Sequence, residues 1–185
     1  MPPPQRSTLR QRGGRAILVA ATLLGGIVAF LALVPRPLVT ASDPVDPSNV
    51  LSASFIISNT NFIPLNSVDV FLAVRELQGA LVLRAERPPQ GTPFSKVARI
   101  IKPEWHDHTL GMDERFTITI ADLLVNQGSG LTWADMAIVV SYKPWILPWR
   151  REKMFRFITR KQTNGRLYWY SFPLDAPVPE FYRPN

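Results

Sequence analysis

Polar and apolar residues alternate with a period of two along much of the chain after residue 50. The alternation is clearest over residues 68–75, and it recurs over residues 52–57 and 116–120. Successive side chains of a β-strand point to opposite faces, so this period predicts half-buried strands. Residues 136–142 are almost entirely apolar, which predicts a strand at the centre of a sheet. This part of the chain shows no long amphipathic helix.

The strongest hairpin signal is the Asn164-Gly165 pair between two strand-like runs, residues 153–162 and 166–172. Asn-Gly favours a two-residue type I′ turn, because both residues tolerate a positive φ. That turn would place Thr163 opposite Arg166 and so fix all the other cross-strand pairs. The residues then expected in the core are Phe155, Phe157, Tyr170 and Phe172. The residues expected on the solvent face are Arg156, Arg160 and Trp169, with Arg160 across from Trp169 within reach of a cation–π contact.

Roughly seven or eight short strands with regularly spaced turns predict an all-β fold. The expected architecture is an immunoglobulin-like antiparallel β-sandwich over residues 50–185. The chain has no cysteine, so the Cys–Trp–Cys signature of immunoglobulin domains is absent and only the architecture is predicted. A domain without disulfides depends on packing and on sheet hydrogen bonds for its stability.

An unbroken apolar run without a charge covers residues 16–34. At about 1.5 Å per residue, a helix of this length spans roughly 28 Å, close to the thickness of a hydrocarbon core. We therefore expect a single N-terminal transmembrane helix. Four arginines precede the run and only Arg36 follows it closely. This asymmetry predicts a cytoplasmic tail at residues 1–15 and a C-terminal domain outside the cytoplasm, at the cell (inner) membrane.

A cleaved signal peptide is the alternative interpretation, with cleavage near Ala41 and a secreted or periplasmic product. Two observations favour the anchor: the apolar run is longer than an ordinary signal h-region, and Arg36 lies between the run and the cleavage site. Both interpretations place the folded domain outside the cytoplasm. Residues 35–49, which are rich in Pro, Ser and Asp, are expected to form an extended extracytoplasmic spacer.

Two stretches resemble known proteins. The sequence FIISNTNFIPLNSVDV of residues 55–70 resembles the first hairpin of many extracytoplasmic immunoglobulin-like domains. The stretch from Ser141 to Trp149, continuing through Gly165 to Trp169, resembles uncharacterised bacterial single-pass membrane proteins that carry one such domain. Together the two stretches cover most of residues 50–172. The resemblance implies this topology and fold, and it implies no catalytic residue.

The net charge of +7 is unevenly distributed. Residues 143–170 contain eight basic residues against one acidic residue, Glu152, whereas residues 16–142 are slightly acidic. A basic segment of this kind can bind a polyanion, such as anionic lipid or cell-wall polymer. Nucleic acid is not an expected partner, because the domain is predicted to lie outside the cytoplasm.

The only candidate metal ligands are Glu104, His106 and His108. On an extended strand the three side chains would point to one side, and two imidazoles with one carboxylate can bind zinc. The alternative is an ordinary polar loop. The sequence has no Gly-x-Ser-x-Gly elbow, phosphate-binding glycine loop or cysteine nucleophile. We therefore expect no catalytic site and no cofactor, with a membrane-tethered metal-binding protein or hydrolase using His106 and His108 as the alternative.

The segment Trp-Ile-Leu-Pro-Trp at residues 145–149 is the most unusual loop of the chain. It either folds back on the sandwich or exposes an apolar patch that contacts a partner or the outer membrane surface. Tryptophan and arginine often dominate binding energy, so this loop is the predicted contact site. Its residues are Trp145, Ile146, Leu147, Trp149, Arg150 and Arg151. The expected function is that of a non-enzymatic membrane protein that binds an envelope protein or scaffolds an envelope assembly.

Overall fold

The computed structural model describes residues 19, 21–26, 36–79, 93–121, 131–145 and 148–179. Contacts divide the chain into two units, residues 1–34 and residues 35–185. In the first unit, residues 21–26 are helical and exposed. Within the described ranges, no helix is long and apolar enough to cross a membrane. Most of the predicted transmembrane helix, residues 16–34, lies outside those ranges.

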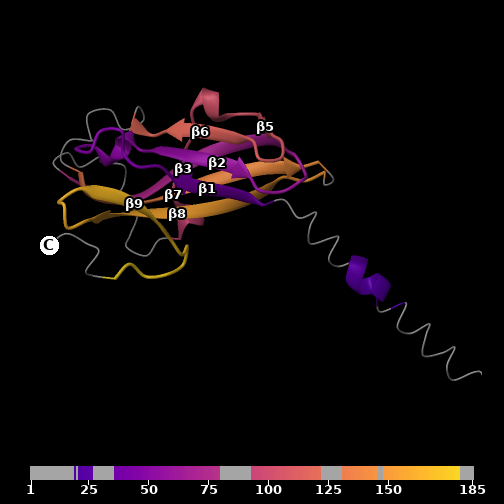
Figure 1. Ribbon diagram of the computed structural model, residues 1–185. Helices are drawn as coiled ribbons and strands as arrows, with labels where there is room; N and C mark the ends of the chain where they lie inside the picture. Colours follow the sequence, from indigo (N-terminus) through magenta and orange to yellow (C-terminus); the bar gives the residue numbers. More distant parts are fainter. Residues whose placement is uncertain are drawn as a thin grey trace, which may run out of the picture. The chain divides into compact units, whose positions relative to one another are not determined.

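The second unit consists mainly of two antiparallel sheets (Figure 1). The smaller sheet has the order β1-β2-β6, formed by β1 (Pro37–Ala41), β2 (Ser54–Asn59) and β6 (Arg115–Thr119). The larger sheet has the order β4-β3-β7-β8-β9, and β5 also pairs with β3. Its strands are β3 (Leu65–Gly79), β4 (Arg99–Ile100), β5 (His108–Leu110), β7 (Leu131–Pro144), β8 (Arg151–Lys161) and β9 (Leu167–Phe172). Three short 3-10 helices are η1 (Val50–Ser52), η2 (Phe94–Lys96) and η3 (Pro103–Trp105).

The main hydrophobic core joins residues of both sheets. Phe55 of β2 and Phe157 of β8 meet edge to face, with ring centroids 5.0 Å apart. On β7, alternate residues from Ala134 to Tyr142 belong to this core. The strand lies between β3 and β8, so the prediction that residues 136–142 form the centre of a sheet is confirmed. The all-β prediction is also confirmed.

Part of the predicted spacer is a strand instead. Residues 37–41 form β1, which pairs with β2 so that Val39 lies opposite Ile57. Val39 is buried in the main core. The strand lies at the edge of its sheet, where a proline such as Pro37 is tolerated because no ladder hydrogen bond is needed from its nitrogen. The folded unit therefore includes residues that the sequence pattern assigned to the spacer.

The β8–β9 turn contains one residue more than predicted. Arg156 pairs with Phe172 and Lys161 pairs with Leu167, so the register is shifted by one residue from the expected pairing. Gly165 donates its N–H to the Gln162 carbonyl at 2.9 Å and has a φ of 79°. A three-residue loop that ends in a left-handed glycine is the next most common hairpin connection after the two-residue turn.

This shift exchanges the two faces of β9. Trp169, predicted on the solvent face, is buried, packs edge to face against Phe55 at 5.7 Å and donates its indole N–H to the Val50 carbonyl at 2.9 Å. It lies opposite Thr159, so the predicted pairing of Arg160 with Trp169 is wrong. Tyr170 and Phe172, predicted in the core between the sheets, are half-buried on the other face.

Candidate functional site

Several loops meet at the end of the two sheets where β1 begins. Thr60 donates its hydroxyl to the Arg36 carbonyl at 2.8 Å, and Asp113 donates its N–H to the Asn59 carbonyl at 3.1 Å. At the same end β7 finishes, with Pro144 opposite Leu65 (Figure 1). We call this region the proximal end and define it by residues 36–37, 60–64, 111–114, 143–145 and 148–151.

The proximal end carries most of the large apolar side chains that this unit exposes. Within the described part of residues 35–185, seven large hydrophobic residues are exposed, and four of them lie on loops here. These four are Phe62 (73% exposed), Met112 (50%), Trp145 (74%) and Trp149 (55%). The predicted contact residues Ile146 and Leu147 lie outside the described residues. The two tryptophans therefore share this end with two further exposed apolar side chains, and the four residues lie on three separate loops.

Arg150, another predicted contact residue, is fixed within the fold. Its guanidinium donates to the Asp69 carboxylate, to the Ser67 carbonyl at 2.7 Å and to the Ser141 hydroxyl at 3.3 Å. These bonds tie the beginning of β8 to β3, so Arg150 has a structural role. Arg151, in contrast, is exposed.

Asp69 is the centre of this polar cluster. Its carboxylate also accepts the Asp107 N–H at 2.9 Å and lies 3.4 Å from Nδ1 of His106. Ser67 and Asp107 have φ values of 47° and 52°, a region that non-glycine residues rarely occupy. The pairing of β3 with β7 shifts between Asn66 and Asp69, and this irregularity places the Asp69 carboxylate between Arg150 and His106.

The three candidate metal ligands do not converge. Glu104 lies in η3 and not on a strand, and the positive φ of Asp107 breaks the parity that the sequence analysis assumed. His106 contacts Asp69, whereas Nε2 of His108 is 2.7 Å from the Glu104 carbonyl oxygen and the His108 ring stacks on Phe116. Within the described ranges, no three His, Cys, Asp or Glu side chains are grouped so that they could hold a metal ion.

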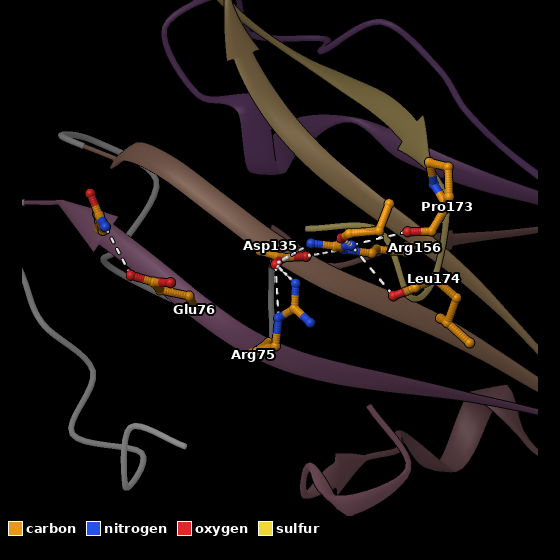
Figure 2. Close-up of polar contacts among 8 residues, drawn as sticks. Arg75, Glu76, Asp135, Arg156, Pro173 and Leu174 are labelled. Atoms are coloured by element: carbon orange, nitrogen blue, oxygen red, sulfur yellow. Dashed lines mark hydrogen bonds and ion pairs between the residues drawn. The ribbon is translucent and has the colours of Figure 1, made fainter. Parts of the chain in front are cut away.

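A buried ionic network on the outer face of the larger sheet was not predicted (Figure 2). Arg156 donates to both oxygens of Asp135, through Nε at 2.9 Å and Nη2 at 3.0 Å. Arg75 of β3 donates to the same carboxylate through Nε at 2.8 Å and through Nη2. Asp135 and Arg156 are almost completely buried. The prediction that Arg156 lies on a solvated face is wrong, because the chain covers that face.

Two segments provide this cover. The first is η2, whose Phe94 ring contacts both guanidinium groups. The ring centroid is 4.5 Å from Arg75 Cζ and 5.8 Å from Arg156 Cζ. The segment after β9 supplies carbonyl acceptors to Arg156 Nη1, from Pro173 at 3.0 Å and from Ala176 at 2.6 Å. Because both Asp135 oxygens are occupied by guanidinium donors, the network fits a structural role better than a catalytic one.

Tyr142 lies near the end of β7, next to the proximal end. Its side chain belongs to the main core, and burial raises the pKa of its phenol above the ordinary value. The positive charge of Arg151, which lies opposite Tyr142 in the β7–β8 pairing, partly opposes this rise of the pKa.

An open groove lies at the other end of the sheets, beside the β8–β9 turn. It is lined by Asp46, Pro47, Ser48, Val50, Leu131, Asn164, Gly165, Arg166 and Leu167. Hydrogen bonds from Ser48 hold the pKa of the exposed Asp46 carboxyl below its usual value. These bonds stay within one turn of the chain and give the groove no evident chemistry.

Comparisons of the chain with protein-family models, with curated proteins and with solved structures found no match. The geometry of the second unit is therefore the basis for the functional argument. Among the described residues, its most unusual feature is the grouping of four exposed apolar side chains at the proximal end.

Proposed function

We propose that the protein is a non-enzymatic, single-pass membrane protein that works by contact at the cell envelope. Its C-terminal unit is an immunoglobulin-like β-sandwich held outside the cytoplasm, and its contact surface is the proximal end. The observation that carries this proposal is the clustering of Phe62, Met112, Trp145 and Trp149 at one end of the sheets. Exposed apolar clusters of this kind mark interaction sites, because exposing them to water is unfavourable.

The membrane anchor is supported by the sequence of the N-terminal segment. Residues 16–34 contain no charge, and four arginines precede them. A run of this length spans a bilayer as a helix, and the arginines keep the N-terminus in the cytoplasm. The apolar contact surface would then act in the compartment outside the cytoplasm.

Anchoring and topology are tested on the full chain in its native membrane. A C-terminal reporter that is active only outside the cytoplasm should be active, and the protein should stay in the membrane fraction through a carbonate wash. The mature N-terminus should be Met1 or Pro2. A mature chain beginning at Ser42 would show that residues 1–41 are a cleaved signal peptide.

The contact role is tested by photo-crosslinking in intact membranes. A photoreactive residue replaces Met112 or Trp149 at the proximal end, and Val45, which is 85% exposed away from this end, is the matched control position. We expect crosslinked products at positions 112 and 149 to exceed those at position 45 several-fold. Equal yields at the three positions would contradict a contact role for the proximal end.

A further inference from the structure

We propose that the proximal end rests on the lipid bilayer, with its four exposed apolar side chains at the level of the lipid headgroups. This inference rests on the proposed function, since it requires that residues 16–34 span the membrane. The occupant of the contact surface is then lipid and not a protein partner.

The length of chain between the apolar run and the folded unit is the first argument. The run ends at Val34 and β1 begins at Pro37, with two residues between them. An extended chain spans at most about 3.6 Å per residue, so the Cα atoms of Val34 and Pro37 are at most about 11 Å apart. The headgroup region of one leaflet is roughly 5–8 Å thick. An anchored chain therefore holds the proximal end against the bilayer surface.

The chemistry of the exposed side chains is the second argument. Tryptophan is enriched at membrane–water interfaces, because its ring is largely apolar while its N–H can bond to headgroups. The four apolar residues, Phe62, Met112, Trp145 and Trp149, lie on three separate loops. This arrangement suits shallow insertion of several side chains into one surface.

The charges at the proximal end are mixed. Arg36, Lys143 and Arg151 are exposed, and Asp113 and Glu114 are exposed at the same end. Arg150 is already paired with Asp69. The excess of positive charge is therefore small, and the apolar side chains supply most of the attraction to the bilayer. Binding of a polyanion would need a larger excess of positive charge than this end carries.

The tether allows a weak contact to persist. A surface held next to its binding site by a short linker has an effective concentration in the millimolar range, so modest affinity is enough. A lipid contact of this kind would fix the orientation of the sandwich on the membrane and direct its far end, with the β8–β9 turn, away from it.

The test uses tryptophan fluorescence of the full chain in vesicles of phosphatidylethanolamine and phosphatidylglycerol, with or without brominated acyl chains, which quench nearby indoles. Three of the five tryptophans, Trp105, Trp133 and Trp169, are buried in the fold. We expect brominated lipid to quench up to two-fifths of the emission, and we expect Trp145→Ser combined with Trp149→Ser to abolish this quenching.

A matched control adds Val45→Trp to the double variant, which restores an exposed tryptophan away from the proximal end. We expect no quenching of this residue. Absence of quenching in the unmodified chain, while the protein stays in the vesicles through a carbonate wash, would overturn the lipid contact and leave the anchor intact. Loss of the protein from the vesicles would instead count against the proposed anchor itself. Photo-crosslinking from position 149 to a protein, with no lipid adduct, would also overturn the inference.

Discussion

The two faces of the larger sheet are both buried, but by different chemistry. The inner face packs apolar side chains such as Met136, Ile138 and Phe157 against the smaller sheet. The outer face combines a small apolar cluster, which includes Val139 and Phe94, with the network of Asp135 and two arginines. The strands of one sheet therefore bury fully apolar residues on one side and ionised residues on the other.

The two faces should therefore respond differently to substitution. Apolar packing is non-directional, so losing one side chain costs its transfer free energy and the cavity that it leaves. A buried ionic network depends on complete pairing, because removing one partner leaves an uncompensated charge away from water. The outer face should therefore be most sensitive at the single carboxylate that both arginines share.

The largest effect is expected for Asp135→Ala. The substitution leaves Arg75 and Arg156 facing each other without a counter-charge, and we expect a loss of about 3–5 kcal/mol in the free energy of unfolding. Urea unfolding measures this loss. Asp175→Ala, at an exposed acidic residue after β9, is the control and should change stability by less than about 0.5 kcal/mol. A cost below about 1 kcal/mol for Asp135→Ala would mean that water reaches this face.

Neighbouring residues of β8 allow a direct comparison of the two faces. We expect Phe157→Ala to cost about 3–4 kcal/mol through the cavity left in the main core. Arg156→Ala should cost about 2–3 kcal/mol, since Asp135 keeps its pairing with Arg75. Arg156→Met should cost less than Arg156→Ala, because it fills the space and leaves a one-to-one ion pair. The same unfolding measurement tests all three variants, and a negligible effect of Arg156→Ala would restore the solvated face that the sequence pattern predicted.

The alternation of residues predicted the inner face well and the outer face poorly. Apolar residues at every second position were enough to identify β2 and β3, and a continuous apolar run was enough to identify β7. Arginine is usually found on solvated faces, and Arg156 is buried only because η2 and residues 173–176 cover it. Those segments are distant in sequence and carry no regular pattern. The strand β1 was missed because its flanking prolines are equally typical of a linker.

The candidate site was predictable only in part. The two loop tryptophans were identified from the sequence, because an apolar loop between prolines is unusual. Phe62 and Met112 were missed, although each directly follows turn residues, Asn61 in one case and Gly111 in the other. Their grouping with Trp145 depends on the pairing of strands from both sheets, which no local pattern specifies.

The turn between β8 and β9 decides which residues of β9 face the core, and Gly165→Ala tests it. The positive φ of Gly165 is unfavourable for alanine, so we expect a cost of about 1–2 kcal/mol. In the two-residue turn predicted from the sequence, Asn164 would also need a positive φ, whereas it has none in the structure. Asn164→Ala should therefore cost only about 0.5–1 kcal/mol, for the lost hydrogen bond to the Arg166 N–H. Equal costs for the two variants in urea unfolding would favour the two-residue turn.

The smallest effect is expected at the proximal end, where tryptophans are exposed and belong to neither buried face. Trp145→Ser combined with Trp149→Ser should change the free energy of unfolding by less than about 0.5 kcal/mol, since exposed side chains away from special contacts contribute little to stability. Trp169→Ser is the matched comparison. It removes a buried indole that packs on Phe55 and bonds to the Val50 carbonyl, and should cost about 3–5 kcal/mol. Thermal unfolding of the three proteins measures the difference. A large loss of stability in the double variant would show that the loop covers the end of the sheets as part of the core, and its tryptophans would then be unsuited to contact with lipid.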